Sequence, residues 1–272
     1  MQMKQSWRAG IVLLGMALLP LHVAAEGNAV SVLSESSSLS APRSPLVPAV
    51  TNMKAEARGA LKRADFARER ASHDARHVAD WVVASGDNQG MPFVIVDKKD
   101  AKVFVFDSGG RILGAAPALL GLARGDDSVP GIGDREYSDM RPEDRTTPAG
   151  RFVAALGRNY RGEDIVWVDY AAAVSLHRVI TTNPEERRLE RLATPTPLDN
   201  RISYGCINVP ARFYETVVSP AFTGTQGIVY VLPEIRSLRD VFGLYDVEDR
   251  GQRHLTSHMP TADKPGGSVV SR

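Results

Sequence analysis

The sequence predicts a mainly β domain, preceded by one long helix and an export signal. Three observations support this prediction. Apolar residues alternate with a period of two between residues 91 and 234, alanines recur every three or four positions between residues 51 and 88, and a short apolar stretch follows two cations at the N-terminus. With 272 residues, the chain can form one sizeable core plus appendages.

The N-terminus has the organisation of a secretory signal. Lys4 and Arg8 precede the apolar residues 11–21, and Val23-Ala24-Ala25 provides small residues for cleavage after Ala25. The apolar stretch is too short to span a bilayer. We expect residues 1–25 to be a cleaved signal peptide and the product to be periplasmic or secreted, with no transmembrane segment in the mature chain. An uncleaved anchor is the alternative.

The overall charge argues against nucleic acid as a partner. The chain has 33 Lys and Arg against 32 Asp and Glu, and removal of residues 1–25 would leave a net charge of −1. Proteins that bind nucleic acid usually show a clear basic excess.

Two segments of distinct composition precede the β domain. Residues 26–50 are rich in Ser and Pro and predict a flexible linker. Residues 51–88 form an alanine-rich segment that predicts a helix from Asn52 to about Ser85. Because an alanine stripe buries little area per turn, we expect this helix to lie along the main domain or a partner rather than to form its own core.

The β domain is predicted to cover residues 91–234. Its expected strands are 93–97, 102–107, 111–114, 151–155, 165–170, 174–179, 206–209 and 227–232. Two long polar segments, 123–147 and 181–202, are typical of lids or binding surfaces. In residues 235–272 we expect a short helix around 238–245, followed by a disordered polar tail.

Cys206 is the only cysteine of the chain. Exported proteins usually carry cysteines in pairs, so an unpaired one is either buried and inert or retained for its chemistry. A neighbouring His and a helix N-terminus both favour the reactive thiolate. Pro210 predicts a helix that begins a few residues after Cys206.

His177 is the candidate base for this thiol. Of the five histidines beyond residue 25, His73 and His77 lie in the predicted helix, and His254 and His258 lie in the tail. Only His177 falls in the predicted β domain, at the end of a strand, where an activated thiol pair could form. The alternative is an ordinary surface histidine.

Gly205 precedes the cysteine and predicts a sharp turn. Such a turn could bring the backbone amides of Tyr204, Gly205 and Cys206 together around a developing oxyanion. The alternative is a plain β-turn glycine.

These residues together carry a family resemblance. The segment Ser203-Tyr204-Gly205-Cys206-Ile207-Asn208, preceded by His177 and by Thr147-Pro148-Ala149-Gly150-Arg151-Phe152, resembles the YkuD-type L,D-transpeptidase domain of bacterial cell-wall enzymes. The resemblance covers about residues 92–233. It implies an L,D-transpeptidase-like β-sandwich or barrel with short helices.

The resemblance also implies a role for each site residue. Cys206 would be the nucleophile and His177 its base, while the backbone carbonyl of Arg178 would orient the imidazole. The three amides named above would form the oxyanion hole. Ser203 and Asn208 would support the loop.

The chain departs from the family pattern at two places. Tyr204 stands where the family usually has a histidine; it could hydrogen-bond a substrate but cannot titrate near neutrality. In addition, 25 residues separate His177 from Ser203, more than is usual. The extra length, residues 182–200, is interpreted either as a substrate lid or as a surface insertion.

Weaker signals concern arginines and paired histidines. Arg178, Arg201 and Arg212 flank the predicted site and could pair with peptide carboxylates, or they are ordinary surface arginines. The two His-x-x-x-His pairs named above lack a third ligand in a known pattern, so we expect no metal site.

The predicted function is that of a peptidoglycan L,D-transpeptidase. A Cys206 thioester would pass to an amine of another stem peptide or of an envelope protein, with no cofactor. One alternative is a hydrolase that uses the same Cys-His chemistry. The other is a catalytically silent module that binds cell-wall peptides.

Overall fold

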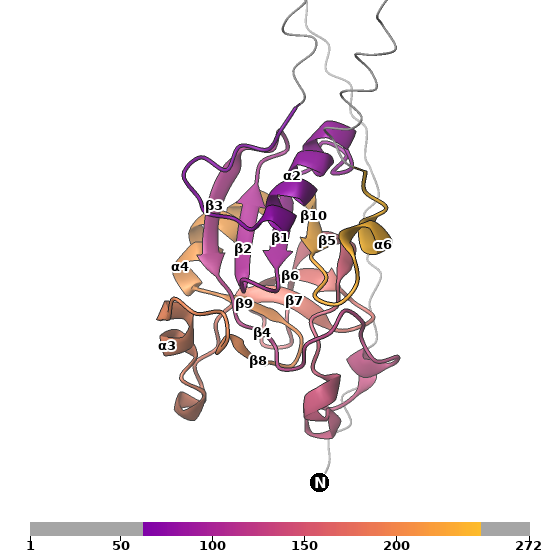
Figure 1. Ribbon diagram of the computed structural model, residues 1–272. Helices are drawn as coiled ribbons and strands as arrows, with labels where there is room; N and C mark the ends of the chain where they lie inside the picture. Colours follow the sequence, from indigo (N-terminus) through magenta and orange to yellow (C-terminus); the bar gives the residue numbers. More distant parts are fainter. Residues whose placement is uncertain (1–61, 246–272) are drawn as a thin grey trace, which may run out of the picture. The chain divides into compact units, whose positions relative to one another are not determined.

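The computed structural model describes residues 62–245. The predicted signal peptide, the linker, residues 52–61 of the predicted helix, the tail from residue 246 and the pair His254 and His258 lie outside this range. The mainly β prediction is confirmed, because an eight-stranded sheet with the order β3-β2-β1-β10-β5-β6-β7-β9 is the central element of the described chain (Figure 1). Strands β4 and β8 form a separate pair.

The strands follow the alternating segments of the sequence. Their bounds are β1 Phe93–Asp97, β2 Lys102–Phe106, β3 Ile112–Pro117, β4 Leu120–Gly121, β5 Gly150–Arg158, β6 Asp164–Asp169, β7 Val174–Arg178, β8 Arg201–Ser203, β9 Ile207–Val209 and β10 Gln226–Val231. The helices are α2 His73–Ser85, η1 Ile132–Asp134, η2 Tyr137–Asp139, η3 Pro142–Asp144, η4 Pro184–Glu186, α3 Arg188–Ala193, α4 Ala211–Phe213, η5 Tyr214–Val218, α5 Ser219–Phe222 and α6 Leu238–Phe242.

The sheet combines sequence-local hairpins with long-range parallel pairs. β1, β2 and β3 pair as an antiparallel meander, and β5, β6 and β7 form a second one. β10 joins the two, since it runs parallel to β1 and antiparallel to β5. β9 is added parallel to β7 at the other end, and this pairing positions the candidate site.

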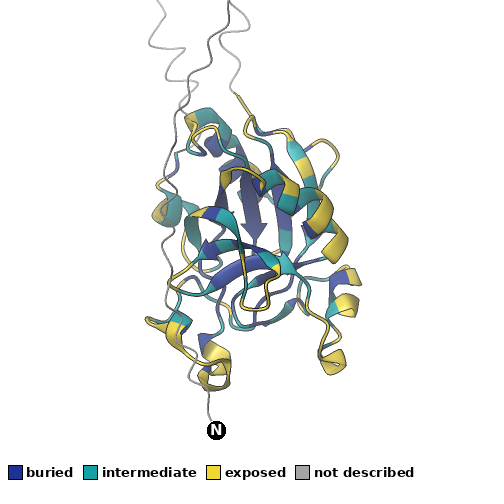
Figure 2. Ribbon diagram, turned by 180° about the vertical axis from the view of Figure 1, so that it is seen from behind, coloured by how far each residue is buried: buried dark blue, intermediate teal, exposed yellow. Residues whose placement is uncertain are grey.

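Apolar layers cover both faces of the sheet. One face packs on the helical segment 211–222, which contributes Tyr214, Val218 and Phe222 to the core. The other face packs on α2. Because both faces are covered, β1 is buried along its whole length, and the central strands are dark blue in Figure 2.

Helix α2 is shorter than predicted. It begins at His73 because Ser72 caps it, its Oγ accepting from the Ala75 N–H at 3.0 Å. The prediction was wrong for residues 62–72, whose backbone bonds to the sheet edge instead: Asp65 N–H donates to Gly110 O and Asp65 O accepts from Ile112 N–H. As expected, the helix lies along the main domain.

The segment after β9 is helical but irregular. The stretch 211–222 widens into the π-helical turn η5 immediately before Ser219 and Pro220. Pro220 lacks an N–H and its ring crowds the carbonyl four residues earlier, which the wider turn accommodates.

A buried charged cluster anchors the long segment 123–147. Lys98 is fully buried, and its Nζ lies 3.0 Å from Asp126 Oδ1 and 2.9 Å from Thr147 O. Glu234 lies 3.7 Å from the same ammonium and accepts from Arg201 Nη2 at 2.6 Å. Both ends of the segment are therefore fixed to the body of the domain.

Candidate active site

Two parallel strands bring His177 and Cys206 together. His177 lies in β7 opposite Asn208 of β9, and Cys206 immediately precedes β9. The imidazole and the thiol act on one another electrostatically, since each shifts the pKa of the other. The thiol is half-buried and free of any disulfide. The two residues singled out from the sequence are thus direct neighbours, although 28 residues separate them in the chain.

The backbone holds the His177 ring in one orientation. Nδ1 lies 2.6 Å from the carbonyl oxygen of Arg178. Because a carbonyl can only accept, Nδ1 carries the proton and Nε2 is left for the thiol. Burial lowers the pKa of His177, but the hydrogen bond and charge of Cys206 and the Arg178 carbonyl outweigh it, so the pKa is raised.

The pKa of the Cys206 thiol shifts in the opposite direction from that of His177. Burial raises the pKa of Cys206, yet the hydrogen bond and charge of His177, with further hydrogen bonds from Ser175, bring it below the ordinary value. The helix N-terminus expected to assist does not adjoin the thiol. Strand β9 intervenes and carries the chain roughly 10 Å away before α4 begins at Ala211.

Gly205 makes the turn that presents Cys206. Its φ is +125°, and a Cβ at this position would lie 2.9 Å from Thr146 O. Thr147 Oγ1 donates to Gly205 O at 2.8 Å. The threonine of the T-P-x-G-x-F segment therefore holds the turn in place.

The predicted oxyanion hole needs a correction. The Gly205 N–H already donates to Ser203 Oγ at 3.1 Å and is not available to a substrate. Among the described residues, no acceptor contacts the backbone N–H of Tyr204 or Cys206. These two amides are the remaining candidates.

Ser203 and Asn208 both bind the backbone of the cysteine. Ser203 Oγ donates to Cys206 O at 2.6 Å, and Asn208 Nδ2 lies 3.2 Å from the same oxygen. Both side chains are buried. This geometry matches the loop-supporting role that the resemblance implies.

Tyr204 stands between the loop and the segment 123–147. The Arg145 guanidinium lies 4.0 Å from the centre of its ring, and the Tyr137 ring lies 5.0 Å from it. Burial and the nearby charge of Cys206 raise the pKa of Tyr137. The long segment predicted to be a lid or binding surface thus forms one wall beside the thiol.

The three flanking arginines have different surroundings. Arg201 is 8% exposed and is engaged with Glu234 and the Lys98 carbonyl, so it is structural rather than substrate-binding. Arg178 pairs with Asp164 at 2.9 Å and with Glu215 at 3.0 Å. Arg212 is exposed.

The insertion 182–200 reaches the site through Arg188, a residue that the sequence reasoning missed. Arg188 Nη1 donates to Asn208 Oδ1 at 2.7 Å, and its side chain is 10% exposed. Asn208 in turn holds the Cys206 carbonyl. The insertion therefore contacts the site, through the asparagine that binds the Cys206 carbonyl.

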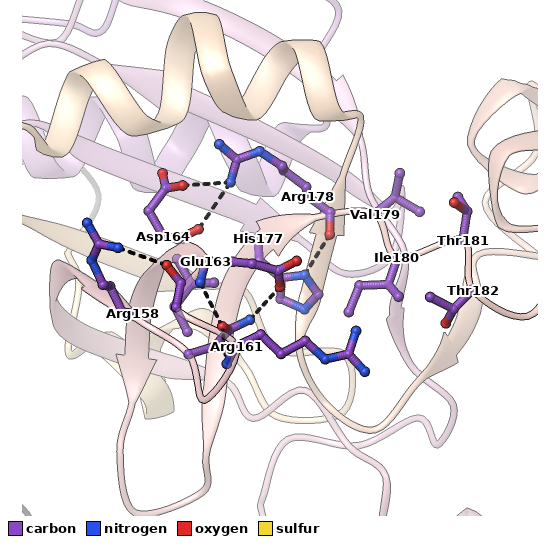
Figure 3. A pocket seen from close by; sticks show the side chains of 13 residues that line it. Arg158, Arg161, Glu163, Asp164, His177, Arg178, Val179, Ile180, Thr181 and Thr182 are labelled. Atoms are coloured by element: carbon purple, nitrogen blue, oxygen red, sulfur yellow. Dashed lines mark hydrogen bonds and ion pairs between the residues drawn. The ribbon is translucent and has the colours of Figure 1, made fainter.

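A pocket of about 540 Å³ borders His177 (Figure 3). It lies between the β5–β6 hairpin, residues 158–165, and the segment 177–182. Arg158 and Arg161 lie at this pocket, and within residues 62–245 neither guanidinium pairs with a carboxylate. The lining also contains Glu163, which accepts from Asn159 Nδ2 at 2.7 Å, so the pocket next to His177 is polar and carries both signs of charge.

Metal ligands do not gather in the part of the chain that the structure describes. No group of three or more His, Cys, Asp and Glu side chains there could hold a metal ion. The rings of His73 and His77 lie 5.9 Å apart on α2. None of the helices within residues 62–245 is both long and apolar enough to cross a membrane.

Comparisons with known proteins give matches among solved structures only. The helical cell shape determining protein of Campylobacter jejuni matches with a TM-score of 0.36 and 15% identity, over 54% of this chain and 49% of that one. An L,D-transpeptidase from Mycobacterium tuberculosis H37Rv gives a TM-score of 0.32 and 15% identity, over 52% and 57%. The catalytic domain of an E. faecium L,D-transpeptidase gives 0.29 and 16%, over 52% and 95%.

No family model and no curated protein sequence matches the chain. The chain spans about half the length of the Campylobacter protein. The function is therefore inferred from the residues of the site.

Proposed function

We propose that this protein is a cysteine acyltransferase that acts on peptidoglycan stem peptides as an L,D-transpeptidase. One observation carries the proposal: the strand pairing sets His177 beside Cys206, each shifts the pKa of the other, and the Nδ1–H of His177 is fixed by the Arg178 carbonyl. A nucleophile, a base and a group that orients the base are the parts that covalent acyl transfer needs.

In the first half-reaction, the Cys206 thiolate attacks the carbonyl carbon of the third stem residue, in the amide that joins this residue to the terminal D-Ala. The C–N bond to the terminal D-Ala breaks, and the imidazolium of His177 gives its proton to the leaving amine. The stem remains on sulfur as a thioester. The amides of Tyr204 and Cys206, which donate to no backbone acceptor within residues 62–245, would stabilise the transient oxyanion.

In the second half-reaction, an amine attacks the thioester carbon. Neutral His177 takes a proton from the amine, the C–S bond breaks and the thiolate is restored. An amine on another stem gives a 3-3 cross-link, and a lysine of an envelope protein gives an anchored protein. The thiol, imidazole and amides supply each step, so no cofactor is proposed.

The assignment to stem peptides rests on the order of motifs and on the pocket. The T-P-x-G-x-F segment, His177 and the S-x-G-C turn occur in the order of the family that the sequence resembles. The Thr147 contact with Gly205 gives two of these motifs a shared structural role. Arg158 and Arg161 provide cations for the carboxylates of a stem peptide. A periplasmic or secreted location fits this substrate.

The deciding experiment incubates the protein without residues 1–25, and its Cys206→Ala variant, with disaccharide-tetrapeptides. Mass spectrometry of the products should show dimers that have lost one D-Ala, and only with Cys206 present. Tripeptides without dimers would instead support the hydrolase. If no product depends on Cys206, the enzymatic proposal is wrong.

A separate labelling experiment tests the catalytically silent module. An active thiol should be alkylated at neutral pH and acylated by a carbapenem, an inhibitor class that the resemblance implies. A Cys206 that reacts with neither in the folded protein would favour a module that only binds cell-wall peptides.

A further inference from the structure

A serine lies against the thiol on the same strand as the base. Ser175 Oγ is 3.6 Å from Cys206 Sγ, and the serine is 5% exposed. Ser175 and His177 are two positions apart in β7, so their side chains point to the same side of the strand. The thiol thus meets two polar groups of one rigid element.

The Ser175 hydroxyl has no competing partner. Within residues 62–245, the Cys206 sulfur is the only group recorded within hydrogen-bonding distance of its Oγ. A buried hydroxyl usually satisfies its donor, and here the sulfur is the atom that can accept it.

A second neighbour of the sulfur, the Ala173 carbonyl, favours the protonated thiol over the thiolate. The carbonyl oxygen of Ala173 lies 3.6 Å from Sγ and can accept only from the protonated thiol. Ala173 holds this position with a φ of +52°, which is uncommon for alanine. The carbonyl favours the thiol form, so the thiolate form needs donors that outweigh it.

We propose that Ser175 is a further catalytic residue, whose Oγ–H donates to the Cys206 thiolate and holds the sulfur against His177. The proposal rests on the nucleophilic role of Cys206 proposed above. No bond is made or broken at Ser175, because its proton stays on oxygen while the thiolate attacks and returns. Its hydroxyl stabilises the charge that His177 creates by accepting the thiol proton.

The test is the pH dependence of Cys206 alkylation by iodoacetamide, measured on the full chain. Ser175→Ala should move the midpoint up by about one pH unit, and slow alkylation about tenfold below the midpoint, since one unit is a tenfold change in thiolate. Ser175→Thr keeps the hydroxyl and should stay close to the original midpoint. Ser108→Ala, at an exposed turn, is the matched control and should change nothing.

An unchanged midpoint in folded Ser175→Ala overturns the inference. If that variant does not fold, as judged by circular dichroism, Ser175→Gly provides a second protein without the hydroxyl. An unchanged midpoint in folded Ser175→Gly would then overturn the inference. A purely structural role would lower the melting temperature without moving the midpoint, which also counts against the inference.

This test is independent of the turnover test. Alkylation needs no peptidoglycan, so a moved midpoint supports the Ser175 contact even if the protein makes no cross-link. Conversely, cross-linking by the unaltered protein with an unmoved midpoint in Ser175→Ala would leave the proposed function standing and remove Ser175 from it.

Discussion

Arg188 Nη1 lies 2.7 Å from Asn208 Oδ1, and this contact ties the insertion 182–200 to the loop that carries the thiol. The link continues from Asn208 Nδ2 to the Cys206 carbonyl. An insertion that distinguishes this chain from the family it resembles thus supports the position of the candidate nucleophile.

Replacing Arg188 should therefore destabilise the domain and loosen the thiol loop. Arg188→Met leaves the buried Asn208 oxygen without its donor, and we expect the free energy of unfolding to fall by about 1–3 kcal/mol in urea titrations. Arg187→Met is the matched control, because Arg187 is exposed and pairs only with Glu190 at the surface. Equal stability of the two variants would show that the contact contributes little.

The pH dependence of thiol reactivity should reflect the His177 pair. Burial raises the pKa of Cys206, but His177 and Ser175 lower it by more, so the net shift is downward. Alkylation should therefore reach half its maximal rate below the ordinary thiol pKa of about 8.5. His177→Ala removes the main lowering influence and leaves the burial, so the midpoint should move above that value. His73→Ala, at a site whose side chain is 88% exposed, should leave the profile unchanged. A midpoint that does not respond to His177→Ala would contradict the pairing.

Gly205→Ala should cost more stability than Gly224→Ala. Both glycines have positive φ, +125° and +74°, so both substitutions carry backbone strain of about 1–2 kcal/mol. Only at Gly205 would the new Cβ also meet backbone, 2.9 Å from Thr146 O, whereas Gly224 has open space. Thermal denaturation of the two variants compares them directly, and the prediction fails if they melt at the same temperature.

The buried ammonium of Lys98 should be a major source of stability. Lys98→Met leaves the buried carboxylates of Asp126 and Glu234 without this cation, and we expect a loss of about 3–5 kcal/mol in the free energy of unfolding. Lys99→Met is the neighbouring control, since the side chain of Lys99 is 53% exposed. A loss at Lys98 no larger than at Lys99 would contradict the role given to the cluster.

Local patterns predicted most of the strands and the candidate pair. Alternation marked most of the strands because it depends only on which face of each strand is covered. The pairing of Cys206 with His177 followed from their being the only cysteine and the only histidine of the β domain. These inferences need no knowledge of how distant segments meet.

Contacts between distant segments were not predictable in the same way. Residues 62–72 have helical composition, but their backbone pairs with Gly110 and Ile112. Arg201 was expected to be available to a substrate, but its guanidinium donates to Glu234, which follows β10. The Gly205 N–H was expected to be free for an oxyanion, but it donates to Ser203 Oγ. For residues 62–72 and Arg201 the competing partner came from a distant segment, whereas Ser203 is two residues from Gly205 and its contact is local.

The sequence by itself determined the class of fold and the candidate nucleophile and base, because these depend on residue type and local periodicity. Tertiary structure decided which arginines are buried and how the insertion meets the site. The parallel pairing of β7 with β9 decides the rest, since it places Ser175, His177 and Cys206 together. Such neighbours arise from packing between strands, and their energies depend on distance and burial that only the folded chain defines.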